Sequence, residues 1–201
     1  TSSIARIVGQ KLAEAWNQQV VVDNRPGGNT TIGTDAMVKS APDGHTILLI
    51  DSTVAVLPNL YASLPYDTLR DIAPVATMAN SKFVLVVHPS IPSKTVQEFI
   101  VLARSRPGQL NFATSGTGTS SHLVGELFNM TAGTKMQHVP YKGAALAVTD
   151  LIGGQVQVSF QVPISALPHV GSGKLKALAI TGQARSPALP QIPTFAEAGL
   201  P

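Results

Sequence analysis

Residues 110–130, LNFATSGTGTSSHLVGELFNM, hold in one stretch the pattern that decides the fold. Residues 110–113 have the pattern of a strand, and a loop of glycine, threonine and serine follows them. A helical pattern then continues through Met130. This stretch predicts a strand, a tight loop and a helix in direct succession.

The same alternation extends outward in both directions. Apolar residues recur at helical spacing from Ile4 to Ala15, behind the N-cap candidates Ser2 and Ser3. Thr95 and Glu98 form a capping box ahead of another helical pattern. The alternation favours an α/β fold, and strands that are apolar on both faces favour a parallel sheet covered by helices. Further strands are expected at residues 20–22, 45–51, 83–87, 137–141, 156–162 and 175–181, and further helices at 31–41 and 144–152.

Composition excludes several functional classes. The chain of 201 residues carries a net charge of +3, and its basic residues neither form runs nor alternate with aromatic residues, which argues against nucleic-acid binding. With no cysteine, zinc fingers, iron–sulfur ligation and thiol nucleophiles are excluded. The five histidines lack the spacing of metal ligands, so no metal or cofactor is expected. No apolar run approaches the roughly 20 residues of a transmembrane helix.

The loop after residue 114 is the most informative candidate site. Its glycines allow the backbone to turn N–H groups outward, and the start of a helix adds partial positive charge. Serine and threonine hydroxyls add further donors, so the loop is a neutral cradle for a carboxylate or a phosphate. It is neither a P-loop nor a GxGxxG motif, since Ser121 stands in place of the third glycine. A tight turn with a Ser/Thr N-cap explains the same residues equally well.

His122 follows three hydroxyl residues, which raises the alternative of a serine-dependent hydrolase that uses Ser120 or Ser121. The chain has no Gly-x-Ser-x-Gly elbow, and no carboxylate stands out to orient the histidine. A histidine that packs or forms a hydrogen bond at the start of a helix is the simpler interpretation. We therefore expect a binding protein and not an enzyme.

Several stretches, in this order, resemble the Bug/TctC family, the extracytoplasmic solute-binding proteins of tripartite tricarboxylate transporters. Each stretch is short, but together they run from one end of the chain to the other. They are VVVDNRPGG (20–28), APDGHTILL (41–49), LPYD (64–67), SGTGTSSHL (115–123), HVPYKG (138–143), LIGGQV (151–156), GKLKALA (173–179) and PTFAEAG (193–199).

The resemblance implies a type II periplasmic-binding-protein fold, in which two α/β lobes close around a small ligand. The proline-rich segment at 88–92 is the best linker candidate, so residues 1–88 are assigned to the first lobe and residues 89–201 to the second. The chain then resembles a middle section of a longer protein, truncated at both ends. The implied protein is periplasmic and monomeric, and its partners are a small carboxylate or dicarboxylate and membrane transporter subunits.

The loop and the resemblance together define the expected ligand-binding residues. The first lobe is expected to face the ligand with Ser2, Ser3 and Ser52, and Gln161 is expected to line the cleft. A ligand-loaded partner of a membrane sensor has the same fold and stays open as an alternative role. The second lobe is expected to hold the ligand with Ser115, Gly116, Thr117, Gly118, Thr119, Ser120 and His122.

Overall fold

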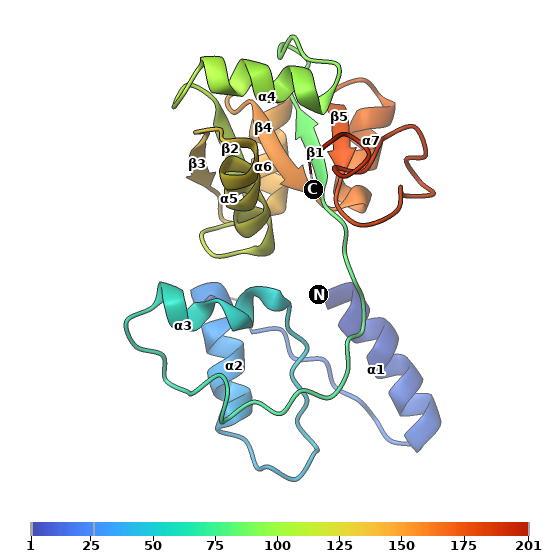
Figure 1. The fold of residues 1–201 in the computed structure, drawn as a ribbon. Helices are drawn as coiled ribbons and strands as arrows, with labels where there is room; N and C mark the ends of the chain where they lie inside the picture. Colours follow the sequence, from blue (N-terminus) through green and yellow to red (C-terminus); the bar gives the residue numbers. More distant parts are fainter. Residues whose placement is uncertain (1, 26, 201) are drawn as a thin grey trace. The chain divides into compact units, whose positions relative to one another are not determined.

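The computed structural model describes residues 2–25 and 27–200, and the chain divides into two compact units, residues 1–80 and 81–201. The sequence placed the boundary after residue 88, but the compact units divide before strand β1 (Val84–Val87). The reason is that β1 forms its hydrogen-bonded ladders with two strands of the second unit. Figure 1 shows the chain passing from one unit to the other just before this strand.

The first unit consists of helices joined by extended segments. Residues 20–22 and 45–51, both predicted as strands, are extended but form no ladder among the described residues. A strand needs a hydrogen-bonded neighbour as well as an apolar sequence, and here Val21 is 78% and Ile47 is 58% exposed. The strand prediction for these two segments is therefore wrong for this structure. The unit contains α1 (Ser2–Trp16), η1 (Gly28–Thr30), α2 (Thr31–Val38), η2 (Ser52–Ala55) and α3 (Leu57–Leu60).

The second unit is built on a five-stranded sheet with the order β3-β2-β4-β1-β5. Strand β2 is parallel to β3 and to β4, as the sequence predicts, but β1 is antiparallel to both of its neighbours. The sheet is therefore mixed and not purely parallel, because an apolar run shows burial on both faces and says nothing of strand direction. The other strands are β2 (Asn111–Thr114), β3 (Gln137–Pro140), β4 (Val158–Gln161) and β5 (Lys176–Ile180).

Helices cover both faces of this sheet (Figure 1). Along β1, Leu85 and Val87 join the core that holds Phe99 of α4 (Val96–Ser105) and Phe128 of α5 (Ser120–Ala132). The alternate residues of β1 join the core that includes α6 (Ala144–Ile152) and α7 (Pro163–Gly171). All four residues of the strand are 0% exposed, which is why its sequence is apolar without alternation.

The topology brings three connections to one edge of the sheet. Strands β2, β3 and β4 run in the same direction, so the residues that follow Thr114, Pro140 and Gln161 leave the sheet at their shared carboxyl edge. Helices α5, α6 and α7 begin after these connections and direct their N-termini to that edge. In open α/β sheets this edge is where ligands bind.

Candidate functional site

Two glycines shape the loop between β2 and α5. Gly116 has φ 141° and Gly118 has φ 79°, values that L-residues with a side chain rarely adopt. The chain can therefore turn sharply from the sheet into the helix within five residues, 115–119. Thr119 is the N-cap residue, but its side chain forms no capping hydrogen bond. Its hydroxyl instead donates to the Gly116 carbonyl at 2.7 Å, which closes the turn.

The amide groups of this loop are bonded within the loop and to its flanking residues. The Gly116 N–H donates to Thr114 Oγ1 at 3.2 Å, and the Gly118 N–H donates to the ring atom Nδ1 of His122 at 3.1 Å. The N–H groups of Ser115 and Thr119 likewise donate to Ser121 Oγ and to the Gly116 carbonyl. This corrects the expectation that the backbone turns these N–H groups outward, because nearby side chains already supply acceptors. The hydroxyl groups are the donors that can rotate toward a ligand.

Ser121 lies at the centre of a hydroxyl cluster. Its Oγ is 3.3 Å from Ser115 Oγ and 3.1 Å from Thr119 Oγ1, and the residue is only 7% exposed. The sequence analysis weighed Ser121 only as a nucleophile and left it out of the binding residues. The structure gives it a supporting role, since it holds the two hydroxyl residues that face each other across the turn.

Beneath the loop, the rings of His122 and His138 stack with their centroids 3.9 Å apart and their planes at 24°. His138 belongs to β3, and its Nε2 lies 2.7 Å from Thr114 Oγ1. Burial, together with the neighbouring ring of His122, lowers the pKa of His138 from 6.5 to about 4. His138 is therefore neutral at physiological pH. The sequence treated it only as a strand residue, because nothing in the local pattern shows that parallel pairing places β3 beside β2.

The ring of His122 accepts from Gly118, and Ser121 Oγ contacts Ser115 and Thr119. The described contacts of Ser121 are thus to Ser115 and Thr119 and not to His122, which gives no support to a Ser121–His122 catalytic pair.

Gln161, the residue expected to line the cleft, ends β4 at the same carboxyl edge as the loop. It is 3% exposed, and its Nε2 donates to Ser159 Oγ at 2.7 Å. Ser159 Oγ in turn donates to the Ala113 carbonyl at 2.7 Å, so the pair ties β4 to the strand that carries the loop.

Of the three contact residues predicted from the first unit, the structure describes the side chain of Ser52 only. Ser52 opens η2 on an exposed turn, where the Asp51 carboxylate accepts from the Thr53 N–H at 3.0 Å. The helix α1 begins at Ser2, but the side chains of Ser2 and Ser3 lie outside the described residues. In the second unit, five of the predicted residues form the loop at 115–119, Ser120 and His122 lie in the first turn of α5, and Gln161 ends β4.

The carboxyl edge of β3 adds charge to the second unit. Lys142 is exposed two residues after the strand, just before α6 begins. The Tyr141 hydroxyl donates to Asp150 Oδ2 at 2.7 Å, and burial together with this hydrogen bond raises the pKa of Tyr141 to about 12. The tyrosine stays protonated and fixes this connection, while the lysine supplies a cation near the starts of α5, α6 and α7.

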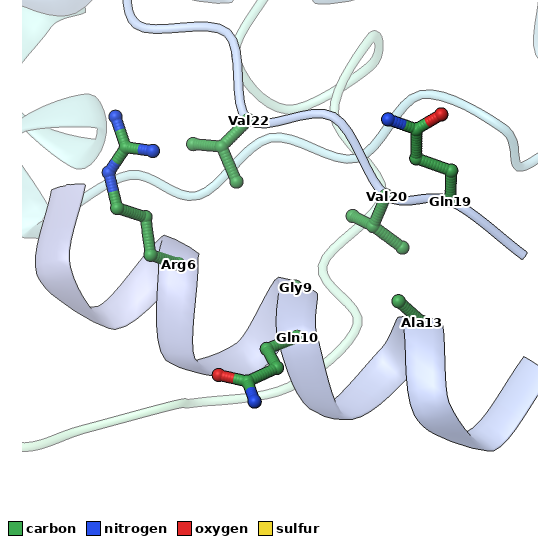
Figure 2. A pocket seen from close by; sticks show the side chains of 7 residues that line it. All are labelled: Arg6, Gly9, Gln10, Ala13, Gln19, Val20 and Val22. Carbon is green, nitrogen blue, oxygen red and sulfur yellow. The ribbon is translucent and has the colours of Figure 1, made fainter.

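The first unit contains a shallow groove of about 310 Å³ between α1 and residues 19–22 (Figure 2). Val20 and Val22 line one side, and Arg6 is its charged residue. It includes none of the residues that the sequence predicted for the site. Among residues 2–25 and 27–200, no group of three or more His, Cys, Asp or Glu side chains is placed to hold a metal ion, and no helix is long and apolar enough to cross a membrane.

Comparison with known proteins gives this architecture a family. Residues 4–201 match the model of the tripartite tricarboxylate transporter family receptor, TctC. The chain belongs to the TctC family. It is 40% identical over 203 residues to the protein BugT of Bordetella pertussis, and the match covers 100% of this chain and 62% of that protein. A protein encoded in the tcbD-tcbE intergenic region of Pseudomonas sp. strain P51 is also 40% identical, with 99% of this chain and 60% of that protein covered. The chain thus spans about three fifths of the length of these TctC relatives.

Solved TctC-type structures confirm the α/β periplasmic-binding-protein fold. A protein from R. palustris solved with adipate is 34% identical with a TM-score of 0.89, and the match covers 100% of this chain and 68% of that one. MatC from Rhodopseudomonas palustris with bound malate is 30% identical with a TM-score of 0.83, covering 99% of this chain and 68% of that one. Both of these neighbours were solved with a dicarboxylate, and the resemblance of this chain to the TctC family is confirmed.

Proposed function

We propose that this TctC chain is the ligand-capturing part of a periplasmic solute-binding protein that takes up a small dicarboxylate and delivers it to transporter subunits in the membrane. The observation that carries the proposal is the similarity, over nearly the whole chain, to two structures with dicarboxylates bound. The protein is a receptor and not an enzyme, in keeping with its family.

The loop at 115–119 is the proposed carboxylate contact of the second unit. It lies at the carboxyl edge of the parallel strands, where the starts of three helices and Lys142 favour an anion. Because several loop amides bond internally, the direct donors are the hydroxyls of Ser115, Thr117 and Ser120, aided by ordered water. The Thr119 hydroxyl, which donates to the Gly116 carbonyl, holds the turn that presents them. Bridging water costs at most about 2 kcal/mol per molecule, so a wet site is compatible with binding.

The proposed first-unit contacts are Ser2, Ser3 and Ser52, and Gln161 completes the second-unit edge. Neutral donors suit a receptor that must release its cargo, since a hydrogen bond to a charged group contributes only about 1.5–3 kcal/mol.

Titration calorimetry on the protein purified with its natural ends tests the proposal. Adipate and malate are the probes. The control is 1,6-hexanediol, which has the six-carbon chain of adipate but no carboxylate groups. We expect binding of at least one dicarboxylate and none of the diol. If neither acid binds, the proposed function is wrong.

The double variant Ser115→Ala/Thr119→Ala tests the loop. We expect its affinity for the bound acid to fall by about tenfold or more, because Ser115 loses a hydrogen bond to the carboxylate of about 1.5–3 kcal/mol and Thr119 loses the bond that closes the turn. The matched control is Thr149→Ala/Ser172→Ala, which removes two exposed hydroxyls that bond only to carbonyls in their own helices. Equal affinity of the two double variants would show that the loop is not the contact.

A further inference from the structure

The stacked histidines offer a role that differs from contact with the ligand. The rings of His122 and His138 pack over Phe112, whose ring centroid is 6.4 Å from that of His122 and 5.2 Å from that of His138. Phe112 itself is 0% exposed. The pair therefore stands on the rigid core of the second unit, directly below the loop.

His122 fixes one end of the loop as a hydrogen-bond acceptor. Its Nδ1 accepts from the Gly118 N–H, so this nitrogen carries no proton and the neutral ring holds its proton on Nε2. The Nε2 atom lies 3.7 Å from Glu126 Oε1. An imidazolium carries a proton on both nitrogens. A proton on Nδ1 would face the Gly118 N–H, and this buried amide would then lack its acceptor.

His138 fixes the other end through Thr114. The Thr114 hydroxyl lies 2.7 Å from His138 Nε2 and 3.2 Å from both the amide nitrogen and the carbonyl oxygen of Gly116. Thr114 is 0% exposed, so this contact is shielded from water. The low pKa of His138, about 4, agrees with a ring that the fold keeps neutral.

The charged surroundings of the pair are sparse. From α5, the carboxylate of Glu126 faces His122, and its other oxygen lies 3.5 Å from Asn129 Nδ2. From β3, the titratable group is His138 itself, and β2 contributes only Phe112 and Thr114. A proton on either ring thus faces a second imidazole at 3.9 Å, with one half-exposed carboxylate near His122.

We propose that His122 and His138 are positioning residues, which hold the 115–119 loop in its binding shape through ring nitrogens that contact Gly118 and Thr114. The proposal rests on the proposed function of this loop as a carboxylate contact. Its consequence is that acid capture depends on the hydrogen-bond acceptor that His122 presents to the loop. His122, which the sequence placed among the ligand contacts, then acts through Gly118.

The test is calorimetric titration of adipate and malate at pH 8. His122→Asn places a carbonyl oxygen close to the position of Nδ1, and this oxygen can accept the hydrogen bond from the Gly118 N–H. We expect His122→Asn to keep the wild-type affinity.

His122→Leu removes the acceptor, and we expect about tenfold weaker binding at pH 8. His45→Asn is the matched control, since this histidine is exposed in the first unit, and we expect it to follow the wild type. Thermal melting of each variant confirms that it folds. His122→Leu binding as tightly as the wild type, or His122→Asn binding as weakly as His122→Leu, overturns the positioning role.

A measurement without ligand separates this proposal from the proposed function. Nitrogen NMR of the histidine rings should show His122 with an unprotonated Nδ1 at pH 8, and a Gly118 amide that exchanges slowly. A proton on Nδ1 at pH 8 overturns the positioning role even where the acids bind. If neither acid binds, the proposed function fails, and the NMR result alone decides whether the histidines hold the loop.

Discussion

Gly125 of α5 is the position where one methyl group should have a clear effect. A Cβ atom built there would overlap the Phe112 ring, whose Cε2 is its nearest neighbour and whose Cδ2 is 2.8 Å away. Phe112 cannot retreat easily, because it is 0% exposed and packs edge-on against Phe160 with ring centroids 6.5 Å apart. The Gly125→Ala change therefore forces the helix away from the sheet or the ring out of its rotamer.

The expected magnitude is the difference between two opposing effects. Overpacking a filled core costs about 1–3 kcal/mol, whereas replacing glycine by alanine inside a helix gains about 1 kcal/mol. The difference is about 0–2 kcal/mol, and the overlap with a fixed ring places Gly125→Ala at the upper end, about 2 kcal/mol, which lowers the melting temperature by about 4–8 °C. Because the displaced ring also supports His122 and His138, the affinity for adipate at pH 8 should fall as well.

Gly171→Ala is the control for this substitution. Gly171 ends α7, and a Cβ atom there would have no neighbour within 4 Å. We expect this variant to melt at the wild-type temperature or slightly above it, since only the gain in helix propensity applies. Calorimetric or circular-dichroism melting of both variants measures the difference. A Gly125→Ala protein that melts at or above the wild-type temperature would refute the packing argument.

Two further predictions concern stability. Asn129→Leu should lower the free energy of unfolding by about 2–4 kcal/mol, as measured by urea unfolding. The reason is that the buried Asn129 side chain accepts from the Met136 N–H at 3.0 Å and donates to the Met136 carbonyl. The folded-state pKa of His138 lies below its unfolded value, so the neutral ring contributes fully to the free energy of unfolding above about pH 6.5, and this contribution is lost as the pH falls toward about 4. We expect the loss in the free energy of unfolding to be about 1 kcal/mol after allowing for solvent screening. Between melts at pH 7 and pH 5, a His138→Gln protein should lose less stability than the wild type by this amount.

Local signals predicted the helices of the second unit well. Helix α4 begins after Thr95, whose hydroxyl accepts from the Glu98 N–H at 3.2 Å, as the capping box indicates. Helix α6 has the predicted bounds of 144–152. Helix α7 was not predicted, because Pro163 and Pro168 interrupt the pattern, yet a proline at the first helical position needs no N–H partner.

Features that depend on distant partners were harder to predict. The direction of β1 follows from its ladders with β4 and β5, far along the chain, and not from its own apolar residues. The segment 45–51 has the sequence of a strand but lacks a ladder, since strand formation needs a second segment. The stacked pair of histidines arises only when parallel pairing sets His138 opposite Phe112.

The loop shows how a correct motif can lead to an incorrect assignment of its atoms. The glycines and hydroxyl residues identified the turn, but the acceptors for its amides come from Thr114, Ser121 and His122. An acid that bonded to one of these amides would first displace a bond of similar strength, so the net gain would be small. The amides are better explained as the groups that fix the shape of the turn, which leaves hydroxyls and water as the contacts of the proposed ligand. A turn that is already ordered loses little conformational entropy on binding, so the proposed site of neutral donors could hold an acid and still release it.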